Sequence, residues 1–299
     1  MHYARDPQSG DFVLGFHRPR SHEILDATRC PVLVPVLDAA LQRLREVSEH
    51  LPQEGEVLGL TDGQVVVLGL PGVRPQPETV EALMSLVDER LVGIELRGGR
   101  QAATIGATVL EVDRVAGLPP MLASPFVFTQ AHAAVNLALV RHVARMARPD
   151  GQRVLELFAG AGNFTRALAK TATRVWASDT DREAIDLLRK LANDARLPIN
   201  AKRQSAPRLL PKLAQAQIEY PVVVLDPPRA GLGQEASAAL AKVASERIVY
   251  VSCDPSTLTR DLEVLDAGGF QILDVTVFDL MPMTPEVETV VTLKRRGTR

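Results

Sequence analysis

The fold is decided by the stretch Val154-Leu155-Glu156-Leu157-Phe158-Ala159-Gly160-Ala161-Gly162-Asn163-Phe164-Thr165. An apolar strand runs here into a glycine turn, and a helix follows. Glycines at such a junction allow a tight turn and a close approach of the backbone to a ligand. The turn lacks the third glycine of the Gly-x-Gly-x-x-Gly motif, so the sequence does not favour a loop that binds the pyrophosphate of a dinucleotide. The stretch therefore predicts an α/β domain with a ligand site at the tip of this strand.

The rhythm around this stretch supports the same fold class. Short apolar strands are predicted at 154–157, 175–178, 222–225, 248–252, 272–278 and 288–294. Helices are predicted at 165–170, 182–193, 207–216 and 235–243. This alternation predicts a mostly parallel sheet with right-handed crossovers.

Residues 1–120 have a different pattern and predict a smaller α+β domain. Strands are expected at 12–16, 57–60, 65–70, 93–96 and 107–112, and helices at 35–47 and 77–87. The pair Asp62-Gly63 indicates a hairpin. The segment 117–120 contains Gly117 and two prolines, so we place the boundary there, with domains at 1–120 and 121–299.

Composition limits the classes of function. The chain has 299 residues, 46% of them apolar, and a formal charge of −2, so nucleic-acid binding would need a local basic patch. The chain has two cysteines, Cys30 and Cys253. This low number favours a reducing, cytoplasmic location, and an all-cysteine iron–sulfur cluster would need four. We find no metal motif among the histidines and no apolar run long enough to span a membrane.

Four side chains stand at predicted strand tips, where open α/β sheets carry their chemistry. Asp179 is suited to bind ribose hydroxyls, or else it caps the next helix. Asp226 precedes two prolines, which make it a rigid, exposed carboxylate. Cys253 is either a nucleophile or a buried small hydrophobe. Glu288 begins the last strand and is either a base or an exposed carboxylate.

Taken together, these motifs resemble the RNA uracil-C5 methyltransferase family, which modifies tRNA and 23S ribosomal RNA. The resemblance covers nearly the whole chain and is strongest over 126–299. Its motifs are Phe128-Thr129-Gln130, the glycine turn at Leu157–Thr165, Leu225-Asp226-Pro227-Pro228-Arg229-Ala230-Gly231, Tyr250-Val251-Ser252-Cys253-Asp254-Pro255-Ser256-Thr257-Leu258, and Pro282-x-Thr284-x-x-Val287-Glu288. The segment from Gly15-Phe16 to Cys30-Pro31 is similar to the family's central domain.

The resemblance implies a Rossmann-like class I methyltransferase domain, with an antiparallel last strand, that uses S-adenosylmethionine (AdoMet). It implies Cys253 as the nucleophile that adds to C6 of uracil, Glu288 as the base and Asp226 as a third catalytic residue. The implied AdoMet contacts are Gln130, Phe158, Gly160, Gly162, Asn163, Asp179 and Asp226. The implied partner is rRNA or tRNA, with candidate contacts at Arg18, Arg20, Arg97, Arg100, Arg229 and Arg260. Taken singly, each of these arginines is more often a solvated surface charge.

The sequence departs from the family pattern at Ala159, His132 and Glu286. We expect Glu286 to raise the pKa of nearby Glu288 by like-charge repulsion. The chain starts beyond the family's N-terminal RNA-binding β-barrel and its iron–sulfur cysteines, which leaves room for a separate RNA-binding partner. A non-catalytic RNA-binding or RNA-folding factor is the alternative from another class. Methylation of a small molecule or an amine is disfavoured by Arg229 and by the pairing of Cys253 with Glu288.

Overall fold

The computed structural model describes residues 1–6, 9–115 and 117–297. The chain divides into two compact units, one formed by 1–112 with 122–126, the other by 113–121 with 127–299. The boundary predicted at 120 falls within 113–126, where the chain passes between the units. Among the described residues, no helix combines the length and apolarity needed to cross a membrane.

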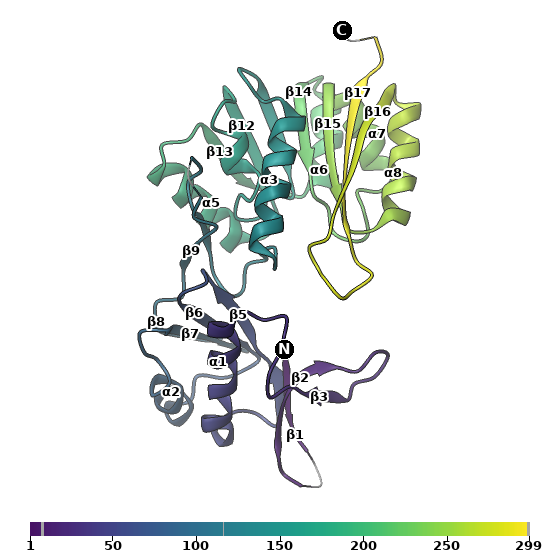
Figure 1. Ribbon diagram of the computed structural model, residues 1–299. Helices are drawn as coiled ribbons and strands as arrows, with labels where there is room; N and C mark the ends of the chain where they lie inside the picture. Colours follow the sequence, from purple (N-terminus) through teal and green to yellow (C-terminus); the bar gives the residue numbers. More distant parts are fainter. Residues whose placement is uncertain (7–8, 116, 298–299) are drawn as a thin grey trace. The chain divides into compact units, whose positions relative to one another are not determined.

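The second unit is built on a seven-stranded sheet. Its strands are β11 (Arg153–Leu157), β12 (Arg174–Asp179), β13 (Ile199–Arg203), β14 (Tyr220–Leu225), β15 (Ala244–Ser252), β16 (Phe270–Phe278) and β17 (Glu288–Arg295). They lie in the order β13-β12-β11-β14-β15-β17-β16 (Figure 1). The first five of these pair in parallel, and β17 is antiparallel to both of its neighbours. The predicted mostly parallel sheet with an antiparallel last strand is confirmed.

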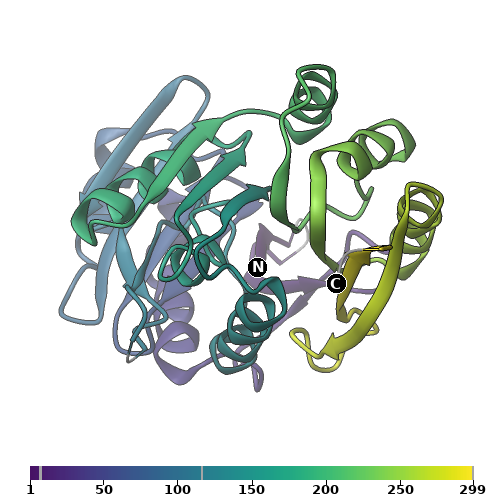
Figure 2. The same ribbon diagram turned by 90° about the horizontal axis from the view of Figure 1, so that it is seen from above.

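Helices flank both faces of this sheet (Figure 2). They are α3 (Ala133–Ala147), α4 (Thr165–Leu168), α5 (Arg182–Asp194), α6 (Ala206–Gln215), α7 (Gln234–Val243) and α8 (Pro255–Ala267). Alternate residues of β14 enter opposite cores: Val222 packs with α3 and α4, whereas Val223 packs with α6 and α7. Each fully buried Val or Leu of this kind stabilises the fold by about 1.5–3 kcal/mol, so these strands form the rigid base of the unit.

The strand order reverses between β11 and β14. The chain leaves β11 for β12 on one side and leaves β14 for β15 on the other. Crossovers that diverge in this way open a crevice at the carboxyl ends of the two strands, which is where open α/β sheets bind ligands. All the predicted site residues of the sheet stand at or beside this edge.

The first unit has two four-stranded sheets. One has the order β3-β2-β1-β4, the other β5-β6-β7-β8. Their bounds are β1 (His2–Arg5), β2 (Phe12–His17), β3 (Ile24–Asp26), β4 (Glu54–Glu56), β5 (Leu58–Thr61), β6 (Val66–Pro71), β7 (Leu91–Gly98) and β8 (Gln101–Gly106). The remaining elements are α1 (Pro35–Arg43), the 3₁₀ helix η1 (Leu44–His50), α2 (Pro77–Met84), and the paired short strands β9 (Leu110–Val112) and β10 (Met121–Ala123). The hairpin predicted at Asp62-Gly63 joins β5 to β6.

Several elements differ from the sequence prediction. The helix expected over 35–47 is α-helical only to Arg43 and continues as a 3₁₀ helix from Leu44, in which Val47 has non-helical φ and ψ angles of −116° and 15°. The strand expected over 107–112 begins only at Leu110; Gly106, in a left-handed conformation (φ 68°), ends the separate strand β8 before it. The sequence pattern does not predict β13 or α3. Most of β13 is polar and only partly buried, so its apolar alternation is weak.

Candidate active site at the carboxyl edge of the large sheet

The glycine turn after β11 uses its two glycines for different purposes. A Cβ on Gly162 (φ 99°) would lie 2.5 Å from the side chain of Leu188, so this glycine allows close packing against α5. A Cβ on Gly160 (φ 53°) would meet no heavy atom within 4 Å. Gly160 therefore borders open space into which a ligand can approach the backbone. Phe158, at the strand tip, also has a left-handed φ of 59°.

Asp179 is held against this turn. Its Oδ2 accepts a hydrogen bond of 2.8 Å from the backbone N–H of Gly160, and its Oδ1 accepts one of 2.9 Å from Asp181. The cap of α5 is Asp181 itself, which accepts from the N–H of Ala184 at 3.1 Å. The helix-cap role is thus filled by Asp181, and the half-buried Asp179 carboxylate stands at the strand tip beside the open glycine.

Asn163 faces into the protein. Its side-chain amide forms a reciprocal pair with Asn136, with distances of 3.0 and 2.9 Å. Asn136 also donates to Asp113 at 2.7 Å, and the fully buried Arg166 contacts the same carboxylate at 3.2 Å. In this arrangement the amide of Asn163 anchors the glycine turn to α3, and its predicted contact with AdoMet stays a prediction.

Gln130 presents a different situation. Its side-chain oxygen is buried and, within the described residues, has no hydrogen-bonding partner. Buried polar atoms are rarely left unpaired in native proteins, so this acceptor is a candidate partner for a hydrogen-bond donor on a ligand. Phe128, two residues earlier, is 73% exposed and lies outside the core.

Glu156, the acidic residue of the strand before the glycine turn, is not among the predicted site residues. It is the penultimate residue of β11 and is 1% exposed, and hydrogen bonding to Thr165 partly opposes the effect of burial on its pKa. Burial raises the pKa of Glu156 to about 8, and the charge of Asp179 adds to the rise. The signal in the sequence is a lone carboxylate within an apolar strand.

Cys253, Glu288 and Asp226 come together from three adjacent strands. Ser252 pairs with Thr289 in the antiparallel ladder, so the next position of the register sets Cys253 opposite Glu288. Asp226 directly follows β14, the other neighbour of β15. Glu288 is 7% exposed and its Oε2 has no partner in the described part of the chain. The thiol of Cys253 is half-buried.

The electrostatics of this cluster favour uncharged forms. Burial raises the pKa of Asp226 well above its ordinary value, and the carboxylates of Glu288 and Glu156 raise it further. Burial likewise raises the pKa of Glu288. The pKa of Cys253 is raised by burial and by Glu288, whereas Arg229 opposes the rise. The resting thiol is therefore protonated, and the cluster can both hold and accept protons.

Glu286 corrects one expectation. Its carboxylate pairs with Arg229 at 3.3 Å, and its pKa is lowered by hydrogen bonding to Thr284, by its own N–H and by Arg229. The raised pKa of Glu288 arises from burial, with no contribution from Glu286. The expected like-charge effect is wrong because the ion pair with Arg229 neutralises the extra carboxylate.

A buried carboxylate fixes the loop that follows Asp226. Asp261 of α8 is fully buried and accepts hydrogen bonds from the N–H of Leu232 and the hydroxyl of Tyr250, both at 2.7 Å. Arg260 donates to the same carboxylate at 3.0 Å. A Cβ on Gly231 (φ 70°) would lie 2.6 Å from the Asp261 Oδ2. The helix that follows Cys253 thus anchors the loop that follows Asp226.

Besides Arg229, which pairs with Glu286, three of the arginines proposed to contact RNA have partners within the protein. Arg260 joins the Asp261 network, Arg97 pairs with Glu95 and stacks on Phe126, and Arg18 pairs with Glu23. Among the residues that the structure describes, no group of three or more His, Cys, Asp or Glu side chains is arranged to hold a metal ion.

Comparisons with known proteins agree with this geometry. The family model described as tRNA (Uracil-5-)-methyltransferase matches residues 123–296. The chain is 31% identical to the 23S rRNA (uracil(1939)-C(5))-methyltransferase RlmD of Thiobacillus denitrificans, over 97% of the chain and 70% of that protein. It is 30% identical to an uncharacterized RNA methyltransferase of Rhizobium meliloti, over 95% of the chain and 68% of the relative.

A solved structure shares the fold. The tRNA (uracil-54, C5)-methyltransferase of Pyrococcus abyssi, crystallised with S-adenosyl-L-homocysteine, superposes with a TM-score of 0.76. The match covers 98% of this chain and 74% of that one, at 23% identity. The predicted Rossmann-like methyltransferase fold is confirmed.

Proposed function

The chain belongs to the tRNA (uracil-5-)-methyltransferase family, and on that premise we propose that it transfers a methyl group from AdoMet to C5 of a uridine in ribosomal or transfer RNA. The observation that carries the proposal is the convergence of Cys253, Glu288 and Asp226 at the tips of three adjacent strands, beside an open glycine turn. RNA substrates and two unpaired cysteines fit a cytoplasmic location.

The residues around the turn suit AdoMet. The open space at Gly160 admits a ligand to the backbone, and the Asp179 carboxylate can accept hydrogen bonds from ribose hydroxyls. The unpaired oxygen of Gln130 can accept from the amino group of the methionine part. When bound, AdoMet supplies an electrophilic methyl group.

Cys253 starts the reaction that we propose. Its sulfur, once deprotonated, bonds to C6 of the uracil, and the C5–C6 double bond becomes an enolate that is nucleophilic at C5. Negative charge then gathers on the uracil O4. Burial raises the pKa of Asp226 well above its ordinary value, which favours the protonated form, and in that form it can donate a hydrogen bond to that oxygen. Arg229 stabilises the thiolate, since it lowers the pKa of Cys253.

Glu288 completes the cycle. After C5 has gained the methyl group, its carboxylate takes the C5 proton, the C5–C6 double bond re-forms and the bond to Cys253 breaks. The raised pKa of Glu288 makes it a better proton acceptor than an ordinary carboxylate. Its unpaired Oε2 leaves one acceptor free for this task.

A non-catalytic RNA-binding factor is the weaker alternative. Glu288 is buried, and Asp226 and Cys253 are half-buried, and burial raises the pKa of all three. Such clusters of perturbed titratable groups are concentrated at catalytic sites. A protein that only binds RNA has no need of them.

Trapping with RNA that contains 5-fluorouracil tests the mechanism. Fluorine at C5 cannot leave as a proton, so the covalent adduct should accumulate in the presence of AdoMet and survive denaturing electrophoresis. Cys253→Ser should abolish the adduct, whereas Cys30→Ser, which changes the other free cysteine, should retain it. An adduct that persists in Cys253→Ser, or its absence in the unmodified protein, would refute the mechanism.

A further inference from the structure

A hollow of about 410 Å³ lies at the carboxyl edge of the large sheet, beyond the tip of β12. Its charged lining comes from two elements: Arg203 ends β13, and Arg208 and Lys212 lie on α6. Thr180 and Ser205 add hydroxyl groups. Neither the sequence motifs nor the proposed chemistry uses this hollow.

The charge in the hollow has one sign. None of the residues that line it carries a carboxylate. Arg203 donates its Nε–H to the backbone oxygen of Thr180 at 2.9 Å, which leaves the other end of the guanidinium available. Arg208 and Lys212 are exposed, and within the described residues their side chains have no ion-pair or hydrogen-bonding partner.

The two carboxylates that flank Thr180 in the sequence are engaged by backbone N–H groups. Asp179 directs both oxygens to the N–H groups of Gly160 and Asp181, and Asp181 caps α5. Arg208 and Lys212 are four residues apart on α6, where like charges repel each other. In a chain whose formal charge is −2, this is an uncompensated local gathering of positive charge.

We propose that this hollow binds a backbone phosphate of the substrate RNA. The inference rests on the proposed function. Guanidinium and ammonium groups with free N–H donors suit phosphate oxygens, and hydroxyl groups can supply further donors. In the strand order, β13 is four strands from β15, the strand that precedes Cys253. At about 4.8 Å per strand, the hollow lies about 19 Å from that strand. A contact there would hold the RNA strand a few nucleotides from the reacting uridine.

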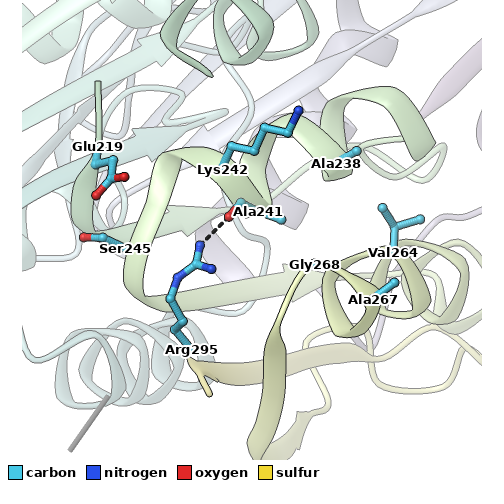
Figure 3. Close-up of a pocket in the computed structure, with 9 residues that line it drawn as sticks. All are labelled: Glu219, Ala238, Ala241, Lys242, Ser245, Val264, Ala267, Gly268 and Arg295. Atoms are coloured by element: carbon cyan, nitrogen blue, oxygen red, sulfur yellow. Dashed lines mark hydrogen bonds between the residues drawn. The ribbon is translucent and has the colours of Figure 1, made fainter. Parts of the chain in front are cut away.

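A second hollow provides the control. It lies at the opposite edge of the sheet, between the ends of α7 and α8, and is lined by Lys242, Arg295 and Glu219 (Figure 3). There Arg295 is occupied by the backbone oxygens of Ala241 and Ala244, and the carboxylate of Glu219 offsets the charge. A phosphate contact is not expected at this hollow, although it also contains an exposed lysine.

The test compares the double variant Arg208→Ala/Lys212→Ala with Lys242→Ala. The substrate is RNA from cells that lack 5-methyluridine, and the affinity for RNA and the KM are measured between 50 and 200 mM salt. Loss of two contacts to single-stranded RNA should lower the slope of log K against log salt by about 1.4 and weaken binding on the order of 25-fold at 0.1 M salt. AdoMet affinity and kcat at saturating RNA should stay unchanged, and Lys242→Ala should behave as the unmodified protein.

The outcomes separate the two proposals. If the unmodified protein methylates uridine and the double variant keeps its salt slope and KM, the phosphate site is refuted while the proposed function stands. If the unmodified protein methylates no RNA, the proposed function itself fails. Inorganic phosphate and AMP are tested as ligands in parallel. Specific micromolar binding of either, lost in the double variant while RNA binding is kept, would mean a small-molecule site and would also refute this proposal.

Discussion

The substitution Glu156→Gln tests whether the carboxyl group of Glu156, buried in β11, is uncharged in the folded protein. Glu156 is 1% exposed, and its pKa is raised from 4.5 to about 8, chiefly by burial. Because the pKa in the folded state lies above that in the unfolded state, the group stabilises the fold fully below pH 4.5. That contribution is lost as the pH rises through 8.

The magnitude follows from these two values. Each unit of difference in pKa corresponds to about 1.4 kcal/mol, so between pH 5 and pH 8 the carboxyl should lose about 3 kcal/mol of stabilisation. Glutamine cannot ionise and should not show this loss. Between pH 5 and pH 8, the unfolding free energy of the unmodified protein should therefore fall by about 3 kcal/mol more than that of Glu156→Gln.

Urea unfolding at pH 5, 6.5 and 8, followed by the fluorescence of Trp176 in the same unit, measures this difference. Glu235→Gln is the control, because Glu235 is an exposed carboxylate of that unit. Equal losses in Glu156→Gln and in the unmodified protein would mean that the carboxyl ionises freely in the fold, and the reasoning from burial would be refuted.

Three further predictions concern the site. Asp261→Asn should lower the unfolding free energy by about 3 kcal/mol, because the buried donors around residue 261 lose a charged acceptor. The same variant should form the 5-fluorouracil adduct more slowly. An unchanged rate would exclude a role of Asp261 in positioning the loop after Asp226. Arg229→Ala should move the pH profile of Cys253 alkylation by iodoacetamide to higher pH, since the cation that lowers the thiol pKa is gone; an unshifted profile would contradict this. Gly160→Ala should weaken AdoMet binding roughly tenfold in calorimetry, because its methyl group enters open space and its left-handed φ is strained; equal affinity would place the cofactor elsewhere.

Much of the site follows from local pattern. Apolar runs that end in Gly160, Asp179, Asp226 and Cys253 predict parallel strands, and parallel strands place their carboxyl ends at one edge. The family motifs supply the proposed roles of these residues. These statements depend on neighbours in the sequence, and the strands β11, β12 and β14 match the predictions to within two residues at each end, whereas β15 begins four residues earlier than predicted.

The tertiary structure decided what depends on contacts between distant segments. The register of β15 and β17 sets Cys253 opposite Glu288, and the pairing of Asn163 with Asn136 turns a predicted ligand contact toward α3. Likewise, Arg229 neutralises Glu286 across 57 residues. The pKa of a group and the net charge of a hollow depend on burial and on interaction partners. Both of these are set by segments that are distant in the sequence. For this reason the sequence alone determined the fold class and the strand-tip residues, whereas only the folded chain determined their protonation, their partners and the basic hollow beyond β12.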